Sequence, residues 1–345
     1  MSARLSLLFT LPAVACAADA QHVATGEIAQ WVSGPALTTP RANHCSTGID
    51  NWVLVIGGNH QVAGGDFVKT DEIAAAQIGA DGTLGPWQVA GHTPSPVTEC
   101  DATSDGRHLY IVDGIYDTDT DGGKVYTAEL DATGMLGTLT AMGALPDGKR
   151  AISSAAAVRD GQLLVMHTDI PDPNNPADQG ALATLHAPLT TMAWGTGDWG
   201  VGFRSQSEFA FGATFAYTIG GYHDPAIGAL PDVFVAPLAG GAATPSTPLP
   251  APVGWGEAAV VDDWLFVTGG RAQTFGGAAS TAVYAAPIAA DGSVGAWQTP
   301  TALPMPRTNH SMALVGDYLV LTGGAASGPG DDKVLVGQVR FSALQ

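Results

Sequence analysis

The chain has 345 residues, of which 46% are hydrophobic, and it carries 45 glycines, 23 prolines and a net charge of −19. This glycine and proline content excludes a mostly helical protein, because both residues interrupt helices. The 32 acidic side chains against 13 basic ones argue against binding to nucleic acid or to anionic lipid, since phosphate contacts need clustered Lys and Arg. They favour a well-solvated surface and cation binding.

The first 20 residues, "MSARLSLLFTLPAVACAADA", follow the pattern of a secretory signal. One Arg precedes an apolar run and then small residues, and Ala18-x-Ala20 suits cleavage before Gln21. Cys16 allows a second interpretation, a lipid anchor after "PAVAC". We therefore expect an exported domain at 21–345 that is periplasmic, outer-membrane-anchored or extracellular. No later apolar run reaches the roughly 18 residues that a membrane helix needs.

An internal repeat organises the rest of the chain. Apolar runs closed by Gly-Gly occur at "WVLVIGG", "TFAYTIGG", "DWLFVTGG" and "YLVLTGG", and two degenerate copies, "LYIVDG" and "LLVMHT", fill the wide gap after the first run. The unit is roughly 50 residues long and contains four strand-like segments separated by turns, which predicts a β-propeller blade. Six units predict an all-β fold, a six-bladed β-propeller in a single domain.

The two ends of the chain are predicted to form one blade together. The last unit starts at Pro306 and has only three strands before the end at Gln345, whereas "GEIAQWVSGPAL" near the N-terminus has the form of a lone fourth strand. We therefore expect residues 26–37 to complete the last blade and close the ring, which removes exposed sheet edges. The matching stretches "PRANH" and "PRTNH" then lie on neighbouring blades.

The unit resembles the bacterial kelch-type repeat. The resemblance rests on the Gly-Gly doublet, on a Trp later in the unit and on the "VYxAxI…DGxxGxW…LPxPR" run at 283–307. It covers nearly all of the predicted mature chain, although units two and three lack the doublet and unit four lacks the Trp. Kelch propellers include protein-binding scaffolds, a sialic-acid mutarotase and copper radical oxidases, so the resemblance implies the fold and not one activity. The residue set of the copper oxidases is not found in this sequence.

The "PR-x-NH" element predicts a ligand site at one rim of the propeller, because the loop before each innermost strand reaches the central channel there. Arg suits carboxylate or phosphate, so converging Arg and His would bind an anionic small molecule such as an acidic sugar. The alternative is that these side chains tie loops to backbone carbonyls. Counting back from Gly-Gly places the candidates at Arg41, Asn43, His44, Glu99, Arg204, Arg307, Asn309 and His310, with Arg150 one position away.

Two further features concern metal and disulfide chemistry. Asp117, Asp119 and Asp121 alternate before Gly122, which is how a calcium loop begins. Ala128 occupies the twelfth position, where an EF-hand needs Glu, so only a looser calcium loop or a solvated acidic turn remains. Cys45 and Cys100 fall at equivalent positions of adjacent innermost strands and are a candidate disulfide in an exported protein.

The sequence therefore predicts an exported propeller that acts as a binding or interaction scaffold, for an anionic carbohydrate or a protein partner. The alternative is a carbohydrate-active enzyme that resembles the kelch-type mutarotase. In that enzyme the rim Arg residues would hold a substrate carboxylate, and Glu99 or His44 would move a proton. The repeated tryptophans Trp31, Trp87 and Trp297 are expected to pack between blades.

Overall fold

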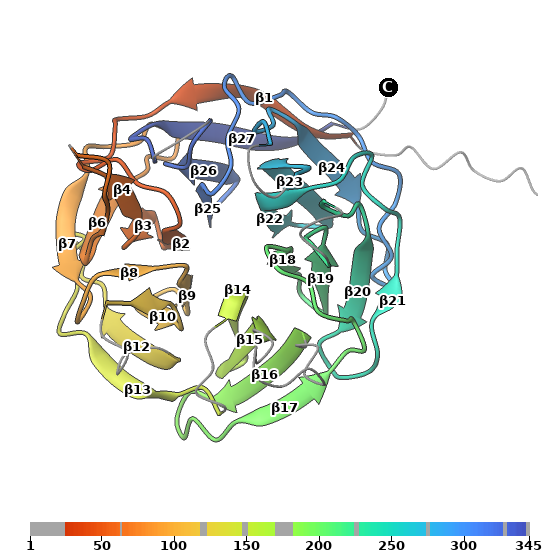
Figure 1. The fold of residues 1–345 in the computed structure, drawn as a ribbon, viewed down its shortest axis with the longest axis horizontal. Coiled ribbons are helices and arrows are strands. Elements are labelled where there is room, and N and C mark those ends of the chain that lie inside the picture. Colours follow the sequence, from red (N-terminus) through yellow and green to blue (C-terminus); the bar gives the residue numbers. More distant parts are fainter. Residues whose placement is uncertain are drawn as a thin grey trace, which may run out of the picture.

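The computed structural model describes residues 25–342, apart from 63, 118–122, 147–150, 170–181, 224–227, 274–276 and 327–329. All regular structure in these residues is β-strand. Six antiparallel sheets of three or four strands surround a central axis (Figure 1), and two further sheets have two strands each. The predicted six-bladed propeller is confirmed. No helix able to cross a membrane occurs in the described part of the chain.

Each blade is given from its innermost strand outward. Blade 1 is β2 (Cys45–Ile49), β3 (Trp52–Ile56), β6 (Glu72–Gln77) and β7 (Gln88–His92). Blade 2 is β9 (Asp101–Ser104), β10 (His108–Val112), β12 (Lys124–Glu129) and β13 (Thr140–Ala144). Blade 3 is β14 (Ala151–Arg159), β15 (Gln162–Asp169), β16 (Leu182–Pro188) and β17 (Gly195–Asp198).

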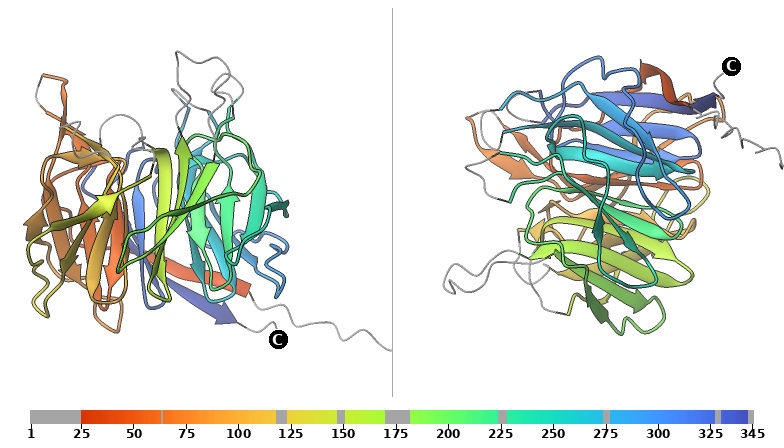
Figure 2. Two further views of the ribbon diagram at one scale, coloured as in Figure 1. Left: turned by 90° about the horizontal axis from the view of Figure 1, so that it is seen from below. Right: turned by 90° about the vertical axis from the view of Figure 1, so that its right-hand side faces the viewer.

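Blade 4 is β18 (Glu208–Phe211), β19 (Phe215–Ile219), β20 (Val233–Pro237) and β21 (Thr244–Pro245). Blade 5 is β22 (Gly254–Val261), β23 (Trp264–Arg271) and β24 (Val283–Pro287). Blade 6 is β25 (Ser311–Val315), β26 (Tyr318–Thr322), β27 (Val334–Ser342) and β1 (Thr25–Ser33). Two short two-stranded sheets extend loops on one face of the ring (Figure 2): the hairpin of β4 (Asn59–Gln61) and β5 (Phe67–Lys69), and the pair of β8 (Val97–Thr98) and β11 (Ile115–Tyr116), which flank β9 and β10 in the chain.

The N-terminal strand closes the ring as predicted. β1 pairs antiparallel with β27, from Thr25 opposite Ser342 to Ser33 opposite Leu335. The backbone pairing continues beyond the strand, because Gly34 and Leu37 donate to the carbonyls of Val334 and Asp332. The fourth strand of blade 5 is shorter than predicted. It is reduced to a single bridge between Gln298 and Ala285, next to Pro300, which cannot donate a ladder hydrogen bond.

The hydrophobic core lies between the blades. Among the described residues, six clusters of buried side chains each join two neighbouring blades, so that every interface in the ring has its own core. The predicted packing role of the tryptophans agrees with this arrangement. Each indole N–H donates to a backbone carbonyl in the segment that leads into its own blade. The pairs are Trp31 with Thr301 O, Trp87 with Pro35 O and Trp297 with Thr247 O.

The Gly-Gly doublets lie where one blade touches the next. Gly57 and Gly58 both have positive φ, and a Cβ on Gly57 would lie 2.4 Å from the carbonyl oxygen of Val97 in the following segment. Only glycine permits both this conformation and this approach. The N–H of the second doublet glycine donates to the next segment at four interfaces, as in Gly58 to Val97 and Gly324 to Arg41. Blade 2 keeps the turn with Asp113 and Gly114, whereas in blade 3 strand β15 continues to Asp169.

Candidate functional site

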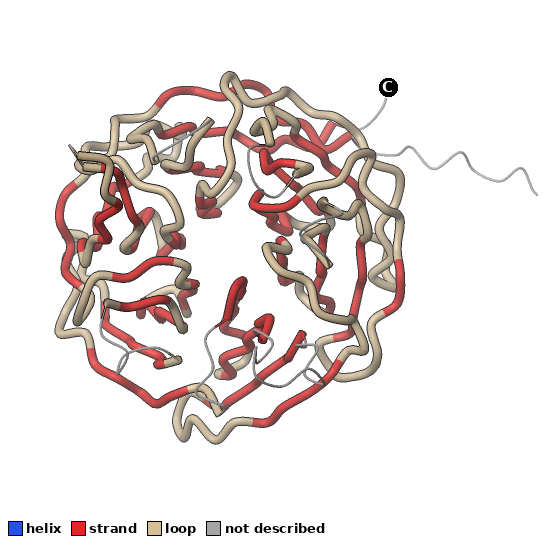
Figure 3. The backbone as a smooth tube through the Cα atoms, viewed as in Figure 1, coloured by secondary structure: helices blue, strands red, loops and turns tan. Residues whose placement is uncertain are grey.

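The central channel holds a cavity of about 410 Å³ that is lined by residues from all six innermost strands. Figure 3 shows these strands around the axis as the innermost red segments. Much of the wall is made of glycine and alanine, including Gly48, Ala155, Ala156, Ala210 and Ala259. These small side chains leave space that larger ones would fill, and the volume falls in the range of small-molecule sites, roughly 300–1,000 Å³.

A chain of backbone hydrogen bonds surrounds one end of the channel. The N–H of Glu99 donates to Asn43 O (2.8 Å), Asn43 to Asn309 O (3.0 Å), Asn309 to Trp255 O (3.0 Å) and Trp255 to Gln206 O (3.3 Å). All five residues have positive φ, between 52° and 57°, and we call them the mouth belt. Three of the predicted site residues, Asn43, Glu99 and Asn309, belong to it and line the cavity.

The mouth belt corrects the predicted alignment of blade 2. The predicted alignment sets Glu99 opposite His44, but Glu99 has the conformation and the place of Asn43. The two cysteines are also not at equivalent positions. Cys45 pairs with the fifth residue of the second strand of blade 1, and in blade 2 the residue with this pairing is Asp101, so Cys100 lies one residue earlier. The two cysteines nevertheless meet across the blade interface in a disulfide, with Cα atoms 5.5 Å apart.

The predicted anion-binding arginines are used within the fold. Arg41 is 0% exposed, and it donates to Gly57 O (3.0 Å) and to the Glu72 carboxylate (2.5 Å). Arg204 and Arg307 donate to the corresponding glycine carbonyls of their own blades, Gly220 O and Gly323 O, and pair with Asp232 and Asp331. None of the three lines the cavity. These contacts are those of the alternative interpretation, in which the arginines tie the loop to backbone carbonyls.

The histidines of the two matching stretches also bind the neighbouring blade. His44 Nε2 lies 2.8 Å from Thr322 Oγ1, and His310 Nε2 lies 3.1 Å from Thr268 Oγ1. Burial lowers the pKa of His44 well below its usual value and lowers that of His310 to about 3. Both rings are thus neutral at physiological pH. They line the cavity but bring no positive charge to an anionic ligand.

The sequence prediction missed a level of carboxylates inside the channel. In each blade, one residue of the innermost strand pairs with the fifth residue of the second strand. Because the pairing is the same in all six blades, these six residues lie at one height along the axis. They are Cys45, Asp101, Ala155, Glu208, Glu257 and Ser311. We call this ring the carboxylate level, because Asp101, Glu208 and Glu257 all belong to it. An alignment by strand register would have found it.

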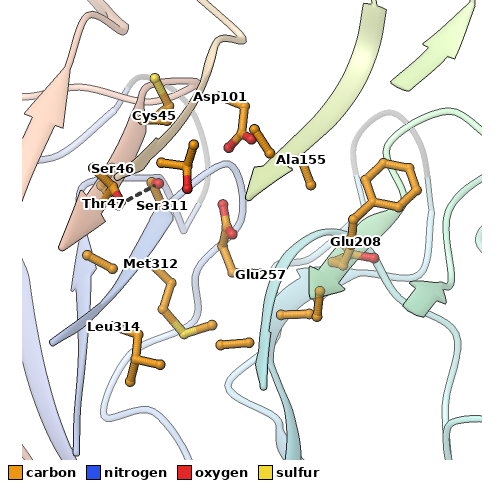
Figure 4. A pocket seen from close by; sticks show the side chains of 18 of the residues that line it. Cys45, Ser46, Thr47, Asp101, Ala155, Glu208, Glu257, Ser311, Met312 and Leu314 are labelled. Carbon is orange, nitrogen blue, oxygen red and sulfur yellow. Dashed lines mark hydrogen bonds between the residues drawn. The ribbon is translucent and has the colours of Figure 1, made fainter. Parts of the chain in front are cut away.

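Figure 4 shows this level from close by. The carboxylates of Asp101 and Glu257 turn toward the same space from blades 2 and 5, which lie opposite one another in the ring. Glu208 is 4% exposed and accepts a hydrogen bond of 2.5 Å from the Gly256 N–H. Among the described residues, Asp101 Oδ2 and Glu208 Oε2 are buried and have no hydrogen-bond partner.

The environment of the three carboxylates favours their protonated forms. Burial raises the pKa of Asp101 to about 7 and that of Glu208 to about 8. Burial, together with the charges of Asp101 and Glu208, raises the pKa of Glu257 well above its usual value. At the mouth, burial raises the pKa of Glu99 as well, and Lys69 opposes this shift. The channel is therefore acidic and short of compensating positive charge.

The expected calcium loop falls mostly outside the described residues. Asp119 and Asp121 lie there, as does Arg150 of the rim prediction. Asp117 is described, and its carboxylate pairs with Lys69 Nζ at 3.1 Å. Among the residues with described positions, no three His, Cys, Asp or Glu side chains are grouped in a way that could hold a metal ion.

Comparison with known proteins identifies the fold only. No protein-family model matches the chain, and no curated protein matches it. A solved structure described as "Structure of YjhT" superposes on it with a TM-score of 0.66 and 14% sequence identity, over 90% of this chain and 99% of that one. At this identity the likeness supports the propeller architecture and carries no information on activity.

Proposed function

We propose that the protein is an exported kelch-type propeller that binds a small polar molecule in its central channel and does not transform it. The observation that carries this proposal is the 410 Å³ cavity at the axis, to which every blade contributes. The mouth belt gives it polar groups at one end, and small side chains keep its interior open. The resemblance to kelch repeats supports the family, through the doublets and the inter-blade tryptophans.

The ligand proposed from the sequence, an anionic carbohydrate, loses its main support. The arginines that were to hold its carboxylate are engaged with Glu72, Asp232 and Asp331. The cavity itself is lined by carboxyl groups, and these repel an anion whenever they are ionised. A neutral or cationic polar ligand suits this channel better.

A channel-filling variant tests the binding function. Ala155 lines the cavity at the carboxylate level, so Ala155→Phe should occupy the space that a ligand needs. A thermal-shift screen of the whole chain would compare acidic sugars, neutral sugars and amines. We expect at least one stabilising class whose effect is lost in Ala155→Phe and kept in Val32→Phe, an exposed control position on β1. The proposal fails if no compound stabilises the protein or if Ala155→Phe responds as the parent does.

An enzymatic role is the second candidate, and the facing carboxylates favour it. Asp101 and Glu257 share one space and have raised pKa values, and such a pair can supply an acid and a base near neutral pH. A carbohydrate-active enzyme of the mutarotase type would accelerate the interconversion of sugar anomers. NMR with added N-acetylneuraminic acid or glucose would detect this, and unchanged rates with either sugar would exclude it for these substrates.

A protein partner is the third candidate, and the β4–β5 hairpin favours it. Val62, Phe67 and Val68 on this hairpin are 37%, 60% and 42% exposed. Apolar side chains grouped on a protruding hairpin are typical of contact sites between proteins. A Phe67→Ser variant should lose a partner that the parent chain retains, and pull-down of the same partners by both forms would contradict this role.

Export, lipid attachment and calcium binding complete the proposal. Export follows from the leader at 1–20, and lipidation would use Cys16; mass spectrometry of the mature protein would distinguish cleavage before Gln21 from a lipidated Cys16. Calcium would be held at the Asp117 loop. A higher thermal midpoint in calcium than in chelator, lost on Asp119→Asn and Asp121→Asn, supports that site, and equal midpoints argue against it.

A further inference from the structure

We infer that the ligand of the central channel is a small organic cation, held at the carboxylate level by Asp101, Glu208 and Glu257. This inference rests on the proposed binding function and names the chemical class of its ligand. Three acidic side chains line one cavity, those of Asp101 and Glu257 facing the same space, and no ion pair among the described residues includes any of the three. An ammonium group between them would supply the missing charge and several N–H donors.

The unpartnered oxygen of Glu208 points to a ligand independently of the cluster. Glu208 is 4% exposed and lines the cavity, but only Oε1 is hydrogen-bonded, to the Gly256 N–H. A buried carboxylate oxygen without a partner costs free energy, which a donor in the cavity would recover. Asp101 Oδ2 is also buried without a hydrogen-bond partner. At least two carboxylate oxygens of residues that line this cavity can therefore accept hydrogen bonds from a ligand.

Other charged groups around the cavity do not fill this role. His44 and His310 are neutral, because burial lowers their pKa values. The Nε2 atom of each ring is hydrogen-bonded to a threonine hydroxyl group. Arg159 lines the opposite end of the cavity, four residues beyond Ala155 on β14, or roughly 13 Å along the strand. Glu99 at the mouth adds further negative charge to the entrance.

Beside Glu208, Arg271 and Tyr222 form a separate group. The Arg271 guanidinium carbon lies 4.0 Å from the centre of the Trp255 ring, and Tyr222 donates to the Arg271 carbonyl. Arg271 forms no ion pair with Glu208 among the described side chains.

Size and donor geometry favour an organic cation over a bare metal ion. No three acidic or histidine side chains of the described residues are placed to hold a metal, whereas an organic cation with several N–H donors can span carboxylates that do not converge on one point. A cavity of about 410 Å³ instead suits a molecule of several heavy atoms. The net charge of −19 would also steer cations toward the protein.

The test is calorimetric titration of the whole chain with putrescine, a diamine, against two matched ligands. 1,4-Butanediol has the same length with hydroxyl groups in place of ammonium groups, and succinate has carboxylates. We expect putrescine alone to bind. Glu257→Gln and Asp101→Asn should each weaken it at least tenfold, whereas the exposed control Glu27→Gln on β1 should leave it unchanged. Thermal unfolding of each variant confirms that it is folded.

Proton linkage gives a readout that surface binding would not move. A cation needs the carboxylates ionised, so its affinity should rise at least fivefold between pH 6 and pH 8.5, with protons released on binding near pH 7. The inference is overturned if putrescine does not bind, or if it binds Glu257→Gln as tightly as the parent. If butanediol or a neutral sugar binds instead and Ala155→Phe abolishes this, the binding function stands without a cation. If no ligand binds, both proposals fail.

Discussion

Asn309 donates a hydrogen bond of 2.6 Å from its side-chain amide to the side-chain oxygen of Asn43, across the seam where the last blade meets the first. The backbone of Asn43 returns the contact, because its N–H donates to Asn309 O at 3.0 Å. The two matching stretches of the sequence are thus adjacent in space. Their repetition has a structural purpose, since each stretch provides one arginine to its own blade and one histidine to the blade before it.

The Arg41–Glu72 pair should be a large contributor to stability. Arg41→Ala would leave a mostly buried carboxylate without its partner, since the two side chains are 0% and 16% exposed. We expect a loss of about 3–5 kcal/mol in the free energy of unfolding, measured by denaturant titration. Arg107→Ala is the matched control, because its pair with Glu129 is exposed and should contribute at most about 1 kcal/mol. Equal losses in both variants would contradict a structural role for Arg41.

Two substitutions on β1 should separate ring closure from surface effects. Ile28 is 1% exposed and belongs to the core between blades 5 and 6, whereas Val32 on the same strand is 50% exposed. Ile28→Ala should lower the free energy of unfolding by about 2–5 kcal/mol, and Val32→Ala should change it by less than about 0.5 kcal/mol. Thermal and urea unfolding would measure both. A stable Ile28→Ala variant would mean that β1 is not needed to close the ring.

The disulfide should stabilise the interface of blades 1 and 2. It closes a loop of 55 residues, so reduction should lower stability by about 2–4 kcal/mol through the greater freedom of the unfolded chain. The measurement is the thermal midpoint with and without a reducing agent. Cys45→Ser/Cys100→Ser serves as the control and should be insensitive to reductant. An equal midpoint shift in this variant would show that the reductant acts elsewhere.

The carboxylate level should make the folded protein less stable at alkaline pH. The pKa values of Asp101 and Glu208, about 7 and about 8, exceed those of the same groups in the unfolded chain. Between the unfolded and the folded pKa values, the folded state therefore binds more protons than the unfolded chain. Stability therefore falls as pH rises from roughly 4 to roughly 8. Thermal midpoints between pH 5 and pH 9 should show this fall, and Asp101→Asn/Glu208→Gln should flatten it. A midpoint that rises over this range would refute the assignment.

Local patterns in the sequence were sufficient to predict the fold. The glycine doublets mark backbone turns that only glycine adopts easily, and the last unit lacks a strand that 26–37 supplies. The rim arginines could not be judged in this way, because the same side chain either binds a ligand or a carbonyl of its own blade. What separates the two for Arg41 is the nearness of Gly57 O and Glu72, which only the folded ring reveals.

The carboxylate level was missed for a different reason. The predicted alignment of blade 2 is one residue out, because it sets Cys100 opposite Cys45, whereas the count of thirteen residues that leads from Gly58 to Cys45 leads from Gly114 to Asp101. Strand pairing places Asp101 there instead. The same count reaches Glu208 from Gly221 and Glu257 from Gly270, but the sequence comparison covered only the PR-x-NH positions that precede this level.

The pairing of β1 with β27 also sets an order of events for the folding chain. The partners that form the last sheet lie near opposite ends of the sequence, from Thr25 to Ser342, and their meeting carries the largest loop-closure entropy in the molecule. The first strand can pair only after the blades between the two ends have brought it to its place. Ring closure should accordingly be the slow, final step, and a chain halted before that step would expose two sheet edges open to pairing with another molecule.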